Sequence, residues 1–195
     1  MSESAHAEHG HEHGQHHEMP TSGHALTQVA VSATLHCLTG CAIGEILGMV
    51  IATALGASNA VSIVLSVALA FVFGYGLTSL PLLRAGMALA AVVPIALASD
   101  TLSIATMEVI DNTIIAVVPD AMDAGLGDLL FWGSLTFSLA VAGALTVPVN
   151  RALIARGKGH AVVHETGIHG GPPIPLVGAL AAAGFVFGLL VLVTT

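Results

Sequence analysis

The sequence predicts an all-α membrane protein, a polytopic helical bundle of about five transmembrane helices that follows a disordered, His-rich N-terminal tail. Hydrophobic residues make up 55% of the 195 residues and charged residues only 8%. A water-soluble domain carries about 25% charged residues, which it needs to cover its surface. The 22 glycines are also typical of membrane helices, because small residues let helices approach closely. Long uncharged apolar segments complete the pattern, so lipid is the expected solvent for most of the chain.

Residues 1–25 form the predicted tail. Its histidines stand among glutamates and glycines, and they are His6, His9, His11, His13, His16, His17 and His24. No hydrophobic periodicity is present, so we expect this segment to be disordered. It also lacks the basic start and apolar core of a cleavable signal peptide, so the first span is expected to be retained. Imidazole suits Zn, Cu and Ni, and the tail is therefore expected to bind such ions weakly.

Residues 26–195 form the predicted membrane domain, in which an apolar segment of about 20 residues is read as a span. The expected spans are residues 29–55, 60–80, 83–105, 129–149 and 174–194. The third apolar segment, residues 82–118, would make roughly 55 Å of helix at about 1.5 Å per residue. A bilayer core is only about 30 Å thick. This helix is therefore expected either to project from the membrane or to break near Ser99–Thr101.

Basic residues predict the orientation of the spans. Arg84 follows the second span, whereas Arg151, Arg156 and Lys158 follow the fourth. Five spans place all four residues on one side, which the positive-inside rule makes cytoplasmic. The N-terminus is then cytoplasmic and the C-terminus outside. Because the chain has only four Lys and Arg residues, nucleic acid is not an expected partner.

Polar residues inside the first span form a column. Successive helical residues are turned by about 100°, so Cys37, Cys41 and Glu45 lie within roughly 80° of arc. Together with the neighbouring His36, they offer thiolate, carboxylate and imidazole ligands that suit copper or zinc. The alternative is that the cysteines are simply small buried residues. Glu45 favours a functional interpretation, because a carboxylate at mid-bilayer depth is costly and normally faces a cavity or a partner.

Glycines recur every four residues beside this column. Gly40, Gly44 and Gly48 predict that another helix packs closely against the first span. Both cysteines lie inside the apolar segment, so a structural disulfide is not indicated.

A second polar column lies on the third apolar segment. Asp100, Met107, Glu108 and Asp111 fall within roughly 100° of arc. We expect the two columns to face each other, because such residues avoid lipid. Asp100, Met107 and Glu108 are then further candidate metal ligands. Alternatively, the four carboxylates that include Glu45 form a proton or cation pathway. A third possibility for Glu108 and Asp111 is a solvated helix end beyond the bilayer.

The loop after the fourth span contains His160 and His164, which are four residues apart. On a short helix this spacing places both side chains on one face, as a secondary cytoplasmic metal site requires. The alternative is that the basic loop only fixes the topology, with its long side chains reaching lipid headgroups.

Four segments carry a resemblance to a known family. They are ATLHCLTGCAIGEILGM, ASDTLSIATMEVIDN, DAMDAGLGDLLFW and PVNRALIARGKGHAVVH. From about Ala33 to His164 the chain resembles the domain-of-unknown-function 4396 family (DUF4396) of small bacterial membrane proteins. The resemblance implies a multi-pass protein of the bacterial inner (plasma) membrane, and it implies no reaction.

Three functions are compatible with these features. The first is a transporter, channel or binding protein for a transition-metal cation, with copper or zinc favoured. The second is a proton or other cation pathway through the intramembrane carboxylates. The third is a non-catalytic accessory subunit of a membrane complex, and we expect either a homo-oligomer or a partner of that kind. The sequence contains no Ser-His-Asp pattern, zinc-protease motif or haem-attachment motif, so an enzyme is the less favoured interpretation.

Overall fold

The computed structural model describes residues 20–164, 166–168 and 173–194. Its helices are α1 (Gly23–Ala54), α2 (Asn59–Arg84), α3 (Leu89–Val117), α4 (Leu129–Ile154), α5 (Ala161–His164) and α6 (Ile174–Thr194). All except the four-residue α5 are long and apolar enough to cross a membrane. The prediction of an all-α membrane bundle with five spans is therefore confirmed. Most of the predicted tail, residues 1–19, lies outside the described residues.

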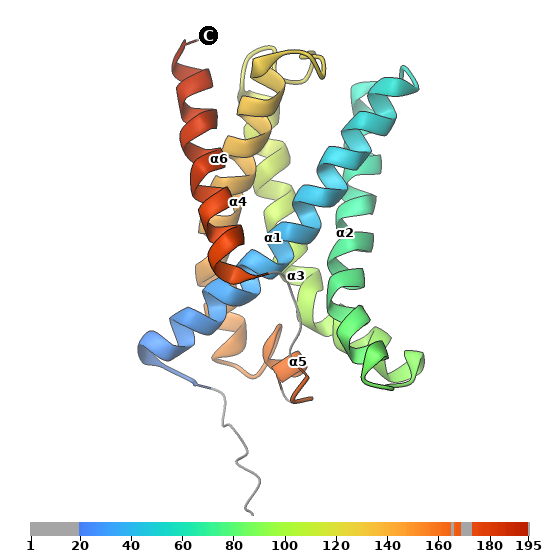
Figure 1. The fold of residues 1–195 in the computed structure, drawn as a ribbon, viewed down its shortest axis with the longest axis vertical. Helices are drawn as coiled ribbons and strands as arrows, with labels where there is room; N and C mark the ends of the chain where they lie inside the picture. Colours follow the sequence, from blue (N-terminus) through green and yellow to red (C-terminus); the bar gives the residue numbers. More distant parts are fainter. Residues whose placement is uncertain (1–19, 165, 169–172, 195) are drawn as a thin grey trace, which may run out of the picture.

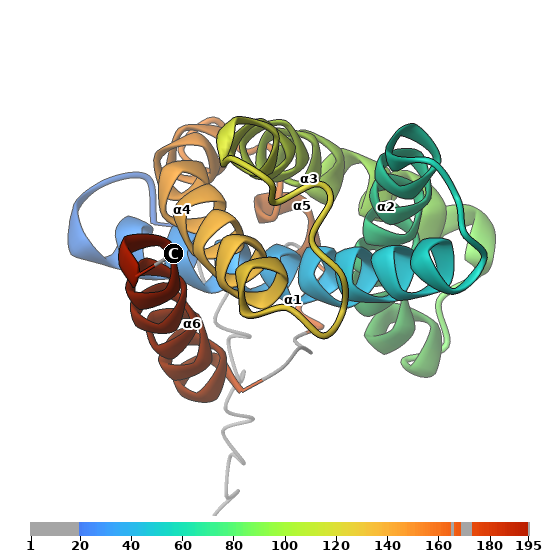
Figure 2. The same ribbon diagram turned by 90° about the horizontal axis from the view of Figure 1, so that it is seen from above.

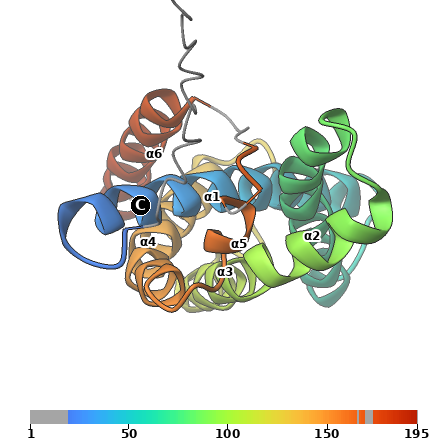
Figure 3. The same cartoon turned by 90° about the horizontal axis from the view of Figure 1, so that it is seen from below.

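The helices run up and down through the bundle, and α1 crosses it obliquely (Figure 1). Seen from above, α3 lies on one side of α1 and α6 on the other (Figure 2). The α2–α3 turn and α5 lie at one end of the molecule, which we name the α5 end (Figures 1 and 3). The segment between α3 and α4, residues 118–128, lies at the opposite end, which we name the loop end. The last turns of α2 and α4 hold Arg84 and Arg151, so these basic residues share the α5 end.

A stripe of small residues holds α1 close to α2. The facing pairs are Gly40 with Gly74, Gly44 with Ala70 and Gly48 with Ser66. A Cβ atom built on Gly40 would lie 2.6 Å from the Cα of Gly74, which leaves no space for a larger residue. The close contact predicted from the glycine repeat is confirmed, and its partner is α2. Because these glycines turn toward α2, the neighbouring face with Cys37 and Glu45 is directed at α3.

The boundary between the second and third spans differs from the expected one. The predicted spans meet at Pro81, whereas α2 continues through Pro81 to Arg84 and the turn lies around Gly86. A proline lacks only its own N–H, so the residues after it can still donate helical hydrogen bonds. Helix α3 is continuous over 29 residues, so the break predicted as one option near Ser99–Thr101 is not observed.

Helix α6 packs mainly on α4 and buries little of its own surface. Gly188 and Val191 are its buried residues. Gly188 allows the backbone of α6 to approach Gly133 and Phe137 of α4. A helix that is apolar on all sides yet largely exposed within the protein is suited to contact with lipid.

Candidate functional site

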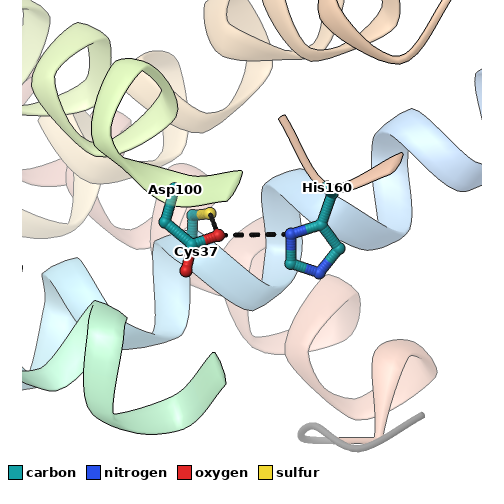
Figure 4. Close-up of side chains that lie close together, drawn as sticks. All are labelled: Cys37, Asp100 and His160. Atoms are coloured by element: carbon teal, nitrogen blue, oxygen red, sulfur yellow. Dashed lines mark hydrogen bonds and ion pairs between the residues drawn. The ribbon is translucent and has the colours of Figure 1, made fainter. Parts of the chain in front are cut away.

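Three residues with metal-binding side chains meet near the α5 end, and we name them the metal triad. Cys37 belongs to α1, Asp100 to α3, and His160 directly precedes α5 (Figure 4). One ligand atom from each lies within 4.8 Å of those from the other two. The Sγ of Cys37 is 3.8 Å and the Nδ1 of His160 is 3.2 Å from the Oδ1 of Asp100. Sulfur, nitrogen and oxygen ligands of these types are the ones that zinc accepts.

The metal triad is enclosed by the bundle. Asp100 has no exposed surface and Cys37 is 2% exposed, while the side chain of His160 is 13% exposed. The ion-pair partner of Asp100 is His160, and not a Lys or Arg residue. The second oxygen of Asp100, Oδ2, accepts no hydrogen bond from any described residue. A buried carboxylate in this situation is costly unless a proton or a cation compensates its charge.

The end of α4 explains how His160 reaches the bundle. Gly157 and Gly159 have φ angles of 66° and 61°, a left-handed conformation that glycine adopts without strain. They turn the chain back beneath the helices. A Cβ atom on Gly159 would lie 3.2 Å from the Cβ of Leu153 and 3.5 Å from the main-chain oxygen of Ser99. The segment therefore lies directly against α3, next to Asp100.

Two further side chains border the metal triad. The hydroxyl of Ser99 donates to Oδ1 of Asp100 at 2.8 Å and lies 3.0 Å from Nδ1 of His160. The ring of His36 lies 5.2 Å from that of His160, measured between centroids. Its Nε2 is 3.0 Å from the hydroxyl of Thr78 on α2. Ser99 thus orients two of the three candidate ligands, and His36 is the nearest additional imidazole.

A second polar group, which we name the carboxylate cluster, consists of Glu45 from α1 with Glu108 and Asp111 from α3. The carboxyl group of Glu45 lies near those of Glu108 and Asp111. Exposed fractions are 0%, 5% and 1%, respectively. Their six oxygens include five that accept no well-formed hydrogen bond from a described residue. The sixth, Oε1 of Glu45, lies 3.5 Å from the amide nitrogen of Asn112.

The two polar columns predicted from the sequence do face each other. Cys37 contacts Asp100 across the α1–α3 interface, and Glu45 lies 3.5 Å from the amide nitrogen of Asn112 on α3. Cys41 and Met107 have no exposed surface and belong to the same core cluster as Cys37. The possibility that Glu108 and Asp111 form a solvated helix end is wrong, because α3 is buried at both residues.

A cavity of about 340 Å³ lies at the loop end. Its walls come from α1, α2, α3, α4 and residues 121–125, and they include Met49, Asn59, Asn112 and Ser134. Asn112 is part of the cavity wall and also reaches Glu45. None of the three carboxylates lines this cavity, and Asn112 lies between the cavity and Glu45, whereas the metal triad lies nearer the α5 end. Cys37 and Glu45 are eight positions apart in the sequence, so about 12 Å along α1 separates the two groups.

The contact of His160 with the intramembrane residues did not follow from the sequence. The sequence predicted a pair with His164, whose side-chain placement the structure does not describe. His160 instead contacts Asp100, which lies 60 positions earlier in the chain. The two glycines that flank Lys158 were the available signal, because they indicate a sharp return of the chain after α4.

The chain belongs to the DUF4396 family, whose model, described as a domain of unknown function, matches residues 27–159. The match extends from α1 to the end of α4, and it includes Cys37, Glu45 and Asp100. It ends one residue before His160 and does not include α6. No curated protein and no solved structure matches the chain. The family description assigns no activity, so the site itself is the guide to function.

Proposed function

We propose that the protein moves a transition-metal cation across the membrane, with zinc the best fit and copper the next. The supporting observation is the convergence of ligand atoms from Cys37, Asp100 and His160 within 4.8 Å inside a helical membrane domain. Zinc accepts thiolate, imidazole and carboxylate ligands, usually four in number. Copper(I) favours sulfur more strongly, so the carboxylate of Asp100 favours zinc.

Features around the metal triad support transport rather than a structural metal. A structural zinc site is normally closed by four protein ligands. Here three residues converge, which leaves one position for water, for His36 or for the next ligand along a path. Further sulfur and carboxylate side chains continue from Cys37 through Cys41 to Glu45 on the same face of α1. Ionisable residues inside membrane helices commonly mark ion pathways.

The proposed setting is the bacterial plasma membrane, with the α5 end in the cytoplasm. The four Lys and Arg residues lie in or after the last turns of α2 and α4, at the end that the positive-inside rule assigns to the cytoplasm. We also propose that the protein forms a homo-oligomer or binds a partner in a membrane complex.

Metal analysis of purified protein without residues 2–19 tests the binding step. This deletion removes six tail histidines, which we expect to bind metal independently of the helices, and it leaves every described helix intact. We expect one zinc ion per chain at neutral pH. Cys37→Ser and His160→Asn should each lose it. His24→Asn is the matched control, because this histidine is exposed in the first turn of α1 and should have no effect.

Zinc flux into liposomes with an internal zinc-sensitive dye tests the transport step. Protein with an intact metal triad should carry zinc, and Cys37→Ser should reduce the flux to that of empty liposomes. If the protein without residues 2–19 bound no zinc, or if Cys37→Ser carried zinc as fast as its parent, the proposed function would be wrong.

The carboxylate cluster favours a second function, a proton pathway without metal. Five of its oxygens lack a hydrogen-bond donor among the described residues, and protonation would relieve that. A pH-sensitive dye in the same liposomes separates the two functions. Proton flux that survives Cys37→Ser and disappears in Glu45→Gln would support the second. Absence of both fluxes would support an accessory subunit.

A further inference from the structure

We infer that Asn150 of α4 is a positioning residue, which sets the distance between the metal-binding side chains of α1 and α3. The family match includes Asn150 but assigns no role to it. Its hold on α1 and α3 stands on hydrogen bonds within the protein. Its importance for metal binding rests on the proposed function.

The amide group of Asn150 joins two other helices. Its nitrogen donates to the hydroxyl oxygen of Thr34 on α1 at 2.9 Å and to that of Ser103 on α3 at 3.0 Å. Both N–H donors of the amide are then used. Each of the three side chains is at most 2% exposed, so solvent does not compete for these bonds. Buried hydrogen bonds of this kind fix one arrangement of the elements that they join.

Both hydroxyl groups lie about one helical turn from a residue of the metal triad. Thr34 precedes Cys37 by three residues on α1. Ser103 follows Asp100 by three residues on α3. The Sγ of Cys37 and the Oδ1 of Asp100 are 3.8 Å apart (Figure 4). Because a binding constellation has to be held within about 0.5 Å, a shift of either helix at its bond to Asn150 would disturb the metal triad.

The same end of α4 supports the third residue of the metal triad. Ile154 follows Asn150 by four residues, and it packs in one cluster with residues of α1 and with Ala161. Ala161 directly follows His160 and is 1% exposed. Asn150 and Ile154 therefore connect α4 to every segment that supplies a candidate ligand.

Thr146 provides a matched control for a role in stability alone. It lies one turn before Asn150 on α4 and has no exposed surface. Its hydroxyl donates to the main-chain oxygen of Ala142 in its own helix at 2.8 Å. Thr146→Val removes this hydroxyl and keeps the shape of the side chain. Asn150→Leu removes both amide donors at similar volume, so an effect that appears only in Asn150→Leu comes from the bonds between helices.

Zinc affinity of the protein without residues 2–19 tests the effect on the metal triad. We expect Asn150→Leu to lower this affinity at least about tenfold, which is the size of effect that outer-shell contacts have at metal sites. Thr146→Val should bind zinc like its parent. With Co²⁺ in place of zinc, in protein that also carries Cys41→Ser, the sulfur-to-cobalt absorption band reports the bond to Cys37. This band should be lost in Asn150→Leu, whereas a change in stability alone would leave it intact.

The reaction of Cys37 with a maleimide in metal-free protein tests the geometry without zinc. Cys37 is 2% exposed, and Cys41→Ser leaves it as the only thiol of the chain. Asn150→Leu should raise the reaction rate roughly tenfold over Thr146→Val, because loss of two buried hydrogen bonds lets α1 and α3 separate beside Cys37.

Double variants test whether Asn150 acts through the two hydroxyl groups. Thr34→Val and Ser103→Ala each remove one acceptor, and each should lower zinc affinity less than Asn150→Leu does. Neither should lower it further when combined with Asn150→Leu, because the shared bonds are already lost. If Asn150→Leu fails to fold, which loss of a single elution peak would show, the two single variants take its place beside Thr146→Val.

Zinc affinity or Cys37 labelling in Asn150→Leu that matches Thr146→Val would overturn the inference. Additive effects of Thr34→Val and Asn150→Leu would also overturn it. Parent protein that binds no zinc would refute the proposed function. The labelling of Cys37 would then still decide whether Asn150 holds α1 and α3 in place.

Discussion

The contact between α1 and α2 allows a prediction whose size can be worked out from distances. In Gly40→Ala the new Cβ would lie 2.6 Å from the Cα and 2.8 Å from the nitrogen of Gly74. Both are backbone atoms of a glycine, so no side chain can move aside. Ordinary van der Waals contact begins near 3.4 Å. The two helices must therefore separate locally by about 0.8 Å, and overpacking of this kind costs about 1–3 kcal/mol.

Gly76→Ala is the matched control, because Gly76 lies inside α2 and a Cβ atom added there would have no neighbour within 4 Å. Both variants gain the same helix propensity, about 1 kcal/mol for alanine over glycine in water. That gain cancels when the two variants are compared. We expect Gly40→Ala to be less stable than Gly76→Ala by about 1–3 kcal/mol.

Reversible unfolding in mixed micelles of mild detergent and SDS measures this difference. The two midpoints should be clearly separated, with Gly40→Ala unfolding at the lower SDS fraction. Zinc affinity should also fall in Gly40→Ala, because a displacement of about 0.8 Å exceeds the roughly 0.5 Å within which a binding constellation must be held. Equal stability of Gly40→Ala and Gly76→Ala would refute the reasoning about the α1–α2 contact.

Three further predictions concern the metal triad, the tail and the topology. Ser99→Ala should lower zinc affinity roughly 10–100-fold, because Ser99 orients two of the ligands. Titration calorimetry on protein without residues 2–19 measures this affinity. A synthetic peptide of residues 1–24 should take up zinc at neutral pH and release it below about pH 6.5, because protons compete for the imidazoles; absence of uptake at neutral pH would contradict this. Reporter fusions to the C-terminus should be active outside the cytoplasm, and activity only in the cytoplasm would reverse the proposed orientation.

The course of the membrane helices could be predicted well, because it depends on local properties of the chain. Low charge and long apolar segments each report on the solvent around a helix. The Gly40 repeat likewise predicted a close helix contact, since glycine at every fourth residue leaves one face of a helix without side chains. The sequence did not tell which helix would occupy that face.

The α2–α3 boundary was harder to predict because a proline permits two interpretations. Pro81 ends the second span if it acts as a helix breaker, yet here it lies in the last turn of a helix that continues to Arg84. The loss of a single hydrogen bond near a helix end is tolerated. Such tolerance depends on neighbouring packing, which a sequence pattern does not report.

The candidate site could be predicted only in part. Helical periodicity placed Cys37 and Glu45 on one face and Asp100 and Asp111 on another, because both sets recur at helical spacing. The approach of His160 to Asp100 depends instead on how the chain turns after α4 and returns to α3. Contacts between residues so far apart in the sequence arise from tertiary packing, and no sequence periodicity predicts them.

X-ray absorption at the zinc edge identifies the atoms bound to the metal, and so tests whether the metal triad holds zinc. The sample is zinc-loaded protein without residues 2–19, beside its Cys37→Ser variant. We predict one sulfur at about 2.3 Å together with nitrogen and oxygen ligands at about 2.0–2.2 Å, and loss of the sulfur in Cys37→Ser. Zinc surrounded by nitrogen and oxygen alone in the parent protein would contradict the proposed site.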